Sequence, residues 1–294
     1  MTTPPTYAGF DLGTSALKAV IVDQRQAIIA ESEVPIASQR PRDLWSEQDP
    51  LDWWAALETA MRELRTKHPQ GFAAIAAIGL SGQMHGAVIL DAADAPLRPA
   101  ILWNDGRSAA QCVALERAVP TSRKITGNLA MPGFTAPKLL WVKQYEPDVF
   151  AATRCVLLPK DYVRLCMTGA KATDLSDAAG TLWVDVAQRA WSGEMLAAGG
   201  LTQDQMPRLH EGCDVTGALR HDVAAAWDMD PVPVAAGGGD NAAGAIGVGV
   251  IDDGDALLSL GTSGVLFVAG SAFGPIPSAP CTHFVMPFRG AGTR

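Results

Sequence analysis

Four short polar segments interrupt the apolar stretches of the chain and contain the side chains that could perform chemistry. They are D-L-G-T-S at 11–15, S-G-Q-M-H at 81–85, W-N-D-G-R at 103–107 and G-G-G-D-N at 237–241. In the first, Asp11 ends a buried strand, and a buried carboxylate needs a cation, a metal ion or several hydrogen-bond donors. The following G-T-S supplies backbone N–H groups, hydroxyls and a glycine, which suit phosphate oxygens beside a magnesium ion. A hairpin in which Asp11 only caps the turn explains this motif equally well.

The segment at 237–241 has three possible interpretations. Asp240 precedes an apolar helix, whose N-terminus favours an ionised carboxylate that can orient or deprotonate a hydroxyl in phosphoryl transfer. Taken in isolation, a plain helix N-cap is the more common role of such an aspartate. Gly237, Gly239 and Ala242 also match the G-x-G-x-x-A dinucleotide fingerprint of NAD-dependent Rossmann dehydrogenases. However, the charge of Asp240 would oppose a pyrophosphate, and repeated βαβ units are absent.

The two middle segments have the composition of a sugar site. Gln83 and His85 lie in a loop, and Trp103, Asp105 and Arg107 combine a flat apolar ring with donors and acceptors. Polar groups bind sugar hydroxyls, and an aromatic ring covers the C–H faces. A structural histidine and an ordinary turn with a helix cap are the alternatives.

The elements that must position these residues alternate between strands and helices. Apolar runs predict strands over 7–12, 16–23 and 27–36 in a meander, over 75–80 and 86–91, and over 232–236. Amphipathic spacing predicts a helix over 50–67 and another ending near 248. Between them, in a mostly helical region from 106 to 209, it predicts helices over 107–118, 136–145 and 160–167. L-G-T-S recurs at 12–15 and 260–263, where strands over 256–260 and 265–269 flank the second turn, so we expect a duplicated motif. This mixture defines an α/β protein.

Composition narrows the class further. The 294 residues suggest about two domains, and the net charge of −8 without a basic run argues against nucleic acid or an anionic membrane as partner. There is no Walker A motif, G-x-S-x-G or H-E-x-x-H. Five cysteines without a C-x-x-C pair argue against zinc and disulfide scaffolds. No signal peptide and no apolar run of about 18 residues occurs, so we expect a cytoplasmic protein.

Longer motifs resemble one known family. They are D-L-G-T-S (11–15), L-W-S-E-Q-D-P (44–50), G-Q-M-H-G (82–86), P-A-I-L-W-N-D-G-R (99–107), I-T-G-N (125–128), M-P-G-F-T-A-P-K-L-L-W-V (131–142), L-L-P-K-D-Y (157–162), D-x-S-D-A-A-G-T (174–181) and A-G-G-G-D-N-A-A-G-A (236–245). Together these resemble the FGGY family of carbohydrate kinases, and several are typical of its xylulose branch. The resemblance runs continuously from about 7 to 268.

The resemblance implies an actin-like, ribonuclease-H-like ATPase fold with a cleft between two domains. Residues 1–248 would form a complete N-terminal sugar-binding domain, and 249–294 the truncated start of the C-terminal nucleotide-binding domain. The implied reaction transfers the γ-phosphoryl of ATP, with magnesium, to D-xylulose and gives D-xylulose 5-phosphate, although this chain alone is expected to be inactive. The resemblance leaves open whether two copies of the chain form a homodimer. The alternative of an actin-like ATP-binding scaffold would need neither Q-M-H nor W-N-D-G-R.

The resemblance also assigns roles to individual residues. Asp240 matches the catalytic base, and Asp11 the carboxylate near magnesium and the phosphates. The phosphate loops are matched by Thr14, Ser15 and Lys18 in the first turn and by Gly261 and Thr262 in the second. Met84 and His85 match the sugar-contacting pair, and further sugar contacts are expected from Gln83, Trp103, Asp105, Arg107 and Asn241.

The resemblance stops near residue 278, although the family continues much further. The segment 280–294 is neither alternating nor helical. Codons can be chosen for this segment so that the reading frame shifted by two bases encodes V-H-T-F-C-H-A-V-P-G-R-W-H. That peptide resembles the family at this point. We therefore expect a frameshift between 278 and 280, with no functional role for Cys281 or His283; the encoding DNA tests this.

Overall fold

The computed structural model describes residues 4–260 and 264–270. The expectations for Gly261, Thr262 and the tail from about 279 lie outside the described residues. No helix in the described ranges is long and apolar enough to cross a membrane.

A mixed central sheet has the strand order β13-β14-β5-β1-β2-β3, and β15 pairs with the end of β5. Its strands are β1 (Thr6–Leu12), β2 (Ala16–Val22), β3 (Ile28–Pro35), β5 (Ile75–Gly82), β13 (Val215–Ala218), β14 (Pro233–Ala235) and β15 (Gly238–Gly239). The predicted meander is confirmed, because β1, β2 and β3 pair antiparallel in succession. β5 and β14 then add in parallel. The carboxyl ends of β1, β5 and β14 therefore meet at one edge.

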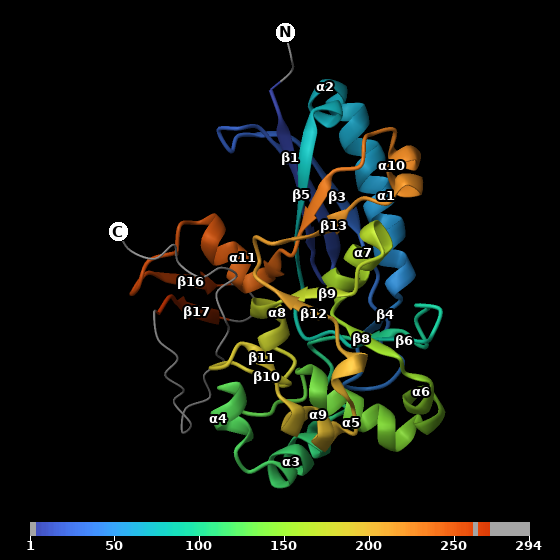
Figure 1. Cartoon of the computed structure of the whole chain (residues 1–294), viewed down its shortest axis with the longest axis vertical. Coiled ribbons are helices and arrows are strands. Elements are labelled where there is room, and N and C mark those ends of the chain that lie inside the picture. The colour runs from blue at the N-terminus through green and yellow to red at the C-terminus, as the bar shows by residue number, and fades with distance from the viewer. Residues whose placement is uncertain (1–3, 261–263, 271–294) are drawn as a thin grey trace.

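Helix α1 (Pro50–Lys67) begins and ends where the sequence predicts. Asp49 caps it by accepting the N–H of Leu51 at 2.9 Å, and Pro50 occupies the first turn, where its missing N–H costs nothing. Its apolar face, including the fully buried Trp53 and Leu57, packs with Phe10 and its neighbours in the main core. On the same side of the sheet lie α2 (Pro69–Ala73), α7 (Pro159–Thr168) and α10 (His221–Trp227), as Figure 1 shows.

A long insertion between β5 and β13 forms a second lobe with its own core, built around residues such as Ile89, Leu139 and Trp183. It contains β6 (Val88–Leu90), β7 (Ala100–Ile101), α3 (Ala109–Ala118), α4 (Ser122–Thr126), α5 (Thr135–Tyr145), α6 (Pro147–Ala152), β8 (Cys155–Leu157), β9 (Ala172–Asp174), α8 (Leu175–Ala179), β10 (Val184–Asp185), β11 (Ala190–Trp191), α9 (Gly193–Gly199), a 3₁₀ turn (Gln203–Gln205) and β12 (Arg208–His210). β7 also pairs with β4 (Glu47–Gln48), which precedes α1. The expected helices α3, α5 and α7 are confirmed. Before, between and after these helices, however, lie strands of two or three residues, which are too short to show an alternating pattern.

Beyond the sheet, α11 (Asp240–Gly247) leads to a hairpin of β16 (Ala256–Leu260) and β17 (Gly264–Val268). The two strands pair antiparallel, which confirms the strands expected on either side of the second G-T-S. A small cluster of Ala245, Val250 and Ala269 joins this hairpin to α11. The domain boundary at residue 248 remains a prediction.

Candidate active site

The carboxyl ends of β1, β5 and β15 bring three of the four polar segments together. In open α/β sheets, ligands bind outside this edge of the strands. β1 ends beside Asp11, β5 runs into the loop with Gln83–Gly86, and β15 leads directly into Asp240 at the start of α11. The fourth segment, 103–107, follows β7 and reaches the same edge through a contact between Trp103 and Thr14.

Alternation along β1 determines where Asp11 points. Phe10 and Leu12 face the main core, so Asp11 lies on the opposite face, where it is half-buried. Its Oδ1 accepts a hydrogen bond of 3.1 Å from Ser81 Oγ on β5. The turn itself is closed by a backbone bond from Gly13 N to Ala16 O. The hydrogen bond of Asp11 therefore goes to the neighbouring strand, and a backbone bond closes the turn.

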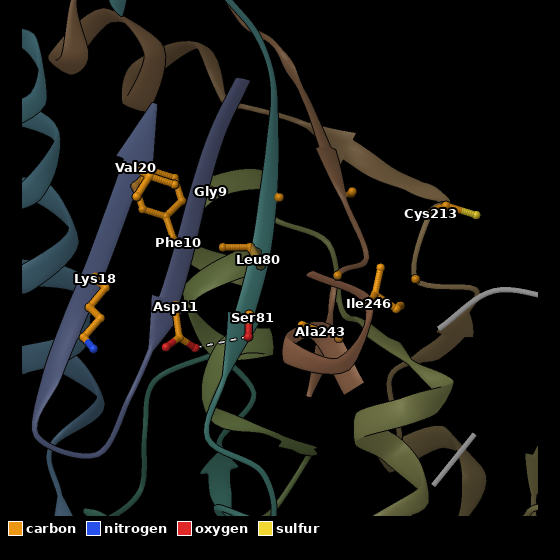
Figure 2. A pocket seen from close by; sticks show the side chains of 15 residues that line it. Gly9, Phe10, Asp11, Lys18, Val20, Leu80, Ser81, Cys213, Ala243 and Ile246 are labelled. Carbon is orange, nitrogen blue, oxygen red and sulfur yellow. Dashed lines mark hydrogen bonds between the residues drawn. The ribbon is translucent and has the colours of Figure 1, made fainter. Parts of the chain in front are cut away.

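A cavity of about 480 Å³ opens beside Asp11 on this face of the sheet. Figure 2 shows Asp11, Ser81 and Lys18 at one end, with Ala243 and Ile246 of α11 across from β5. Lys18 is the antiparallel partner of Asp11 on β2 and is exposed. The cavity therefore has one polar end, with a carboxylate and an ammonium, and walls that are otherwise mostly apolar.

Thr14 joins the first turn to two of the predicted sugar residues. Its hydroxyl donates to Gln83 Oε1 at 3.2 Å and accepts from Trp103 Nε1 at 2.9 Å. The amide nitrogen of Gln83 donates to Gln48 Oε1 at 3.0 Å. Gln83 is buried and bonded to protein groups on both sides, so it connects loops. Ser15, in contrast, is exposed.

Sequence reasoning missed Gln48, although it lies in the quoted L-W-S-E-Q-D-P motif. It is fully buried, and its Nε2 donates to Thr14 O at 2.6 Å and to Ser38 Oγ at 3.0 Å. Its Oε1 also accepts from Trp53 Nε1 at 2.9 Å. Gln48 thus holds the G-T-S turn after β1 against Trp53, near the start of α1.

Asp105 and Arg107 form a buried pair that supports the Trp103 loop. Arg107 donates from Nε and Nη2 to the two Asp105 oxygens, at 2.9 and 2.7 Å, and Nη1 lies 2.8 Å from Glu47. The guanidinium also lies 3.6 Å from the ring centre of Trp45. The side chains of both are at most 1% exposed, whereas Trp103 is 44% exposed. Among Trp103, Asp105 and Arg107, only the side chain of Trp103 is accessible to a ligand.

Both the ring and the backbone carbonyl of His85 make hydrogen bonds to neighbouring residues. Its φ of +67° is unusual for a side chain of this size, and its Nδ1 lies 2.7 Å from Gly180 O. Burial lowers the pKa of His85 to about 4, so the ring is neutral at pH 7 and Nδ1 donates to this carbonyl. The His85 carbonyl accepts from Thr135 Oγ1 at 3.0 Å and from the buried Lys138 Nζ at 2.8 Å. Thr135 and Lys138 were not predicted as site residues.

Asp240 is the first residue of α11, and Gly239 occupies the N-cap, which corrects the N-cap interpretation of Asp240 by one residue. Asp240 Oδ1 accepts from Asn241 N at 2.7 Å and from Asn241 Nδ2 at 3.1 Å. Although the carboxylate reaches solvent, surrounding protein removes part of its hydration. This desolvation and the negative charge of Asp11 raise the pKa of Asp240 to about 6, against the opposing hydrogen bond from Asn241 N. Met84 packs beneath, because a Cβ on Gly239 would lie 2.8 Å from Met84 Sδ.

Behind this edge lies a buried ion cluster, which we define as Lys160, Asp161, Arg164, Asp174 and Asp177. Lys160 Nζ lies 2.7 Å from an oxygen of Asp161, 2.7 Å from Asp174 and 3.0 Å from Asp177, and Arg164 lies 2.6 Å from Asp161. Burial, with the nearby carboxylates, raises the pKa of Asp177 well above its usual value. The raised pKa favours the neutral form of Asp177, which reduces the excess of carboxylates over the two cations.

Comparison with known proteins agrees with this fold. Residues 6–247 match the profile described as "FGGY family of carbohydrate kinases, N-terminal domain". The chain belongs to this family, and its actin-like, ribonuclease-H-like architecture is confirmed.

The relatives at higher identity share one name. The chain is 55% identical to "Xylulose kinase" of Escherichia coli strain K12, covering 95% of this chain and 57% of that protein. It is 54% identical to "Xylulose kinase" of Klebsiella pneumoniae, with coverage of 97% and 58%. The solved "xyloylose kinase" from Brucella ovis superposes with a TM-score of 0.91 at 52% identity, over 92% of this chain and 56% of that chain. The chain thus spans somewhat over half the length of these relatives.

These findings overturn the dehydrogenase alternative. Within residues 4–260 and 264–270, the central sheet begins with an antiparallel meander and does not have the successive βαβ units of a Rossmann domain. Gly238 and Gly239 pair with β5 as a short strand. The G-x-G-x-x-A match at 237–242 is therefore fortuitous.

Proposed function

We propose that the chain is the sugar-binding part of an ATP-dependent kinase that phosphorylates D-xylulose to D-xylulose 5-phosphate. The observation that carries this proposal is the position of Asp240. It is a carboxylate of raised pKa at a helix N-terminus, close enough to Asp11 for the two charges to interact. Met84 packs against Gly239 just before it, His85 follows Met84 in the loop after β5, and Trp103 exposes its ring at the same edge of the sheet.

Asp240 would act as the general base for the terminal hydroxyl of the sugar. A pKa of about 6 leaves it mostly ionised at pH 7, yet basic enough to accept a proton as the hydroxyl attacks. Asn241, which donates to Asp240, would keep the carboxylate oriented and offer its amide to a second hydroxyl. His85, neutral with its proton on Nδ1, has an Nε2 of acceptor character. Trp103 would cover a C–H face of the sugar.

The donor set at the first turn fits magnesium and phosphate. Asp11 offers carboxylate oxygens, the ligands that Mg²⁺ prefers, and Lys18 provides positive charge across the strand pair. Thr14 and Ser15 follow in the turn, although the Thr14 hydroxyl is engaged by Gln83 and Trp103. When bound, magnesium ATP supplies the phosphoryl group and neutralises charge on it. Asp11 and Lys18 would hold it beside the sugar hydroxyl.

Titration calorimetry of the chain with D-xylulose, D-ribulose, glycerol, ATP and NAD tests the proposal. Saturable binding of D-xylulose, tighter than that of glycerol and without NAD binding, is the expected result. ATP binding without any sugar binding would instead favour the actin-like scaffold. Phosphoryl transfer is tested separately, with the chain fused to the part of a relative that lies beyond residue 278.

A further inference from the structure

A single hydrogen-bonded path joins the buried ion cluster to the residue before Asp240. The backbone N–H of Gly239 donates to Ser176 Oγ at 3.2 Å. Ser176 Oγ donates in turn to Asp174 Oδ2, and Asp174 Oδ1 lies 2.7 Å from Lys160 Nζ. Ser176 and Gly239 are 63 residues apart in sequence, so the path links α8 directly to the start of α11.

The direction of each hydrogen bond along this path is fixed. A serine hydroxyl has one proton, and here it goes to a carboxylate, so a lone pair of Oγ faces the Gly239 N–H. The Asp174 carboxylate cannot rotate, because Oδ2 also accepts the N–H groups of Ser176 and Asp177, at 2.8 and 3.1 Å, as the cap of α8. Lys160 holds its other oxygen. Both Asp174 and Ser176 are fully buried.

The cluster also holds the upstream end of the same segment. Arg164 Nη2 donates to the carbonyl of Ala236, and Arg164 is itself paired with Asp161. Gly237 has a φ of +77°, and a Cβ there would collide with the Leu80 carbonyl. Segment 236–239 is therefore fixed at both ends by the cluster and has little freedom between them. Asp240 follows at once.

We propose that Ser176, aligned by Asp174, is a positioning residue for Asp240. Through the Gly239 N–H it sets where α11 begins, and hence how deeply the Asp240 carboxylate sits and how strongly it senses Asp11. Its meaning for catalysis rests on the proposed function, but its effect on Asp240 does not require any substrate.

The test uses this chain with Ser176→Ala, and Thr153→Val as matched control. Thr153 is a buried residue whose hydroxyl donates to Val149 O at 2.9 Å in α6, away from the site. The Asp240 carboxyl pKa is measured by carbon-detected NMR titration, and the Gly239 amide by hydrogen exchange. With Ser176→Ala we expect the pKa to fall from about 6 by at least half a unit, because a displaced carboxylate is better hydrated and further from Asp11. Exchange at Gly239 should rise at least tenfold.

Two results would overturn the proposal. One is an unchanged pKa and unchanged Gly239 exchange in Ser176→Ala; the other is an equal pKa change in Thr153→Val, which would indicate general loosening. If Ser176→Ala does not fold, Ser176→Cys keeps the side-chain shape and the neutral charge with a weaker acceptor and donor, and it should shift the pKa in the same direction by less. D-xylulose binding is measured independently, so its absence from the unsubstituted chain would count against the proposed function alone.

Discussion

The indole Nε1 of Trp103 donates a 2.9 Å hydrogen bond to the hydroxyl of Thr14, across 89 residues of sequence. One partner belongs to the expected sugar set and the other to the first turn. This hydrogen bond connects the two halves of the site, so substitution of one of the two side chains should alter the energetic contribution of the other.

We expect this bond to be measurable as a coupling between Trp103→Phe and Thr14→Val. Net hydrogen bonds contribute about 0.5–1.5 kcal/mol, so a double-mutant cycle on the free energy of unfolding in urea should give a coupling in that range. The matched control is a second cycle in which Trp191→Phe takes the place of Trp103→Phe. Trp191→Phe also removes an indole hydrogen bond, to Pro207 O at 2.9 Å in the second lobe. A coupling indistinguishable from zero would show that the contact does not hold the turn.

Asp240→Asn should abolish phosphoryl transfer in the fusion of this chain with the part of a relative that lies beyond residue 278. The amide keeps the shape and hydrogen bonding of the side chain but cannot accept the proton. D-xylulose affinity should therefore stay within about tenfold while kcat falls to background. The measurements are coupled-enzyme kinetics and calorimetry on the same preparation. Turnover near that of the parent would exclude the general-base role.

Asp11→Asn should lower the pKa of Asp240, because the negative charge of Asp11 is one of the two causes that raise it to about 6. The fall should be partial, since desolvation is the larger cause and remains. NMR titration of the Asp240 carboxyl in the two proteins measures this directly. A pKa that stays at the parent value would mean that the two carboxylates do not interact. In the fusion protein, the same substitution should also weaken the use of magnesium ATP.

Gly180→Ala should displace His85. A Cβ at this position would lie 2.6 Å from the His85 ring, so the ring must move and lose its bond to Gly180 O. We expect D-xylulose affinity to fall by about tenfold or more, the size of one well-made polar contact. Gly193→Ala is the control, since its Cβ would meet no atom within 4 Å. Equal sugar affinities for the two variants would show that His85 does not contact the sugar.

Asp177→Asn should remove a pH dependence of stability. The folded-state pKa of Asp177 is raised, so the folded chain keeps a proton that the unfolded chain releases above its usual value of 3.8. Stability contributed by this group therefore falls as pH rises from about 4 towards the folded-state pKa, by about 1.4 kcal/mol per pH unit. Urea unfolding at several pH values should show this slope in the parent and a flatter curve in Asp177→Asn. Asp161→Asn, which leaves Arg164 without its carboxylate, should instead cost about 3 kcal/mol or more.

Local patterns were sufficient to predict the meander and α1. Strand periodicity and the Asp49–Pro50 helix start are properties of neighbouring residues, and the structure confirms them. The site was harder to predict, because polarity alone does not distinguish a side chain that meets a ligand from one that supports it. Gln83 and Arg107 have the composition of sugar contacts, yet both are buried in networks with protein partners. Such partners, 35 to 69 residues away from Gln83, become neighbours only through the fold.

The charge balance of the buried ion cluster also constrains how its sequence can change. The cluster holds two cations and three carboxyl groups, of which Asp177 has a raised pKa, and none of the five side chains is exposed to water that could screen an imbalance. A substitution that removes one charge leaves its partner buried and uncompensated. Viable sequences should therefore exchange these residues in compensating pairs, for example Arg164 together with Asp161. Covariation of these positions would mark the part of the chain that keeps Asp240 in place.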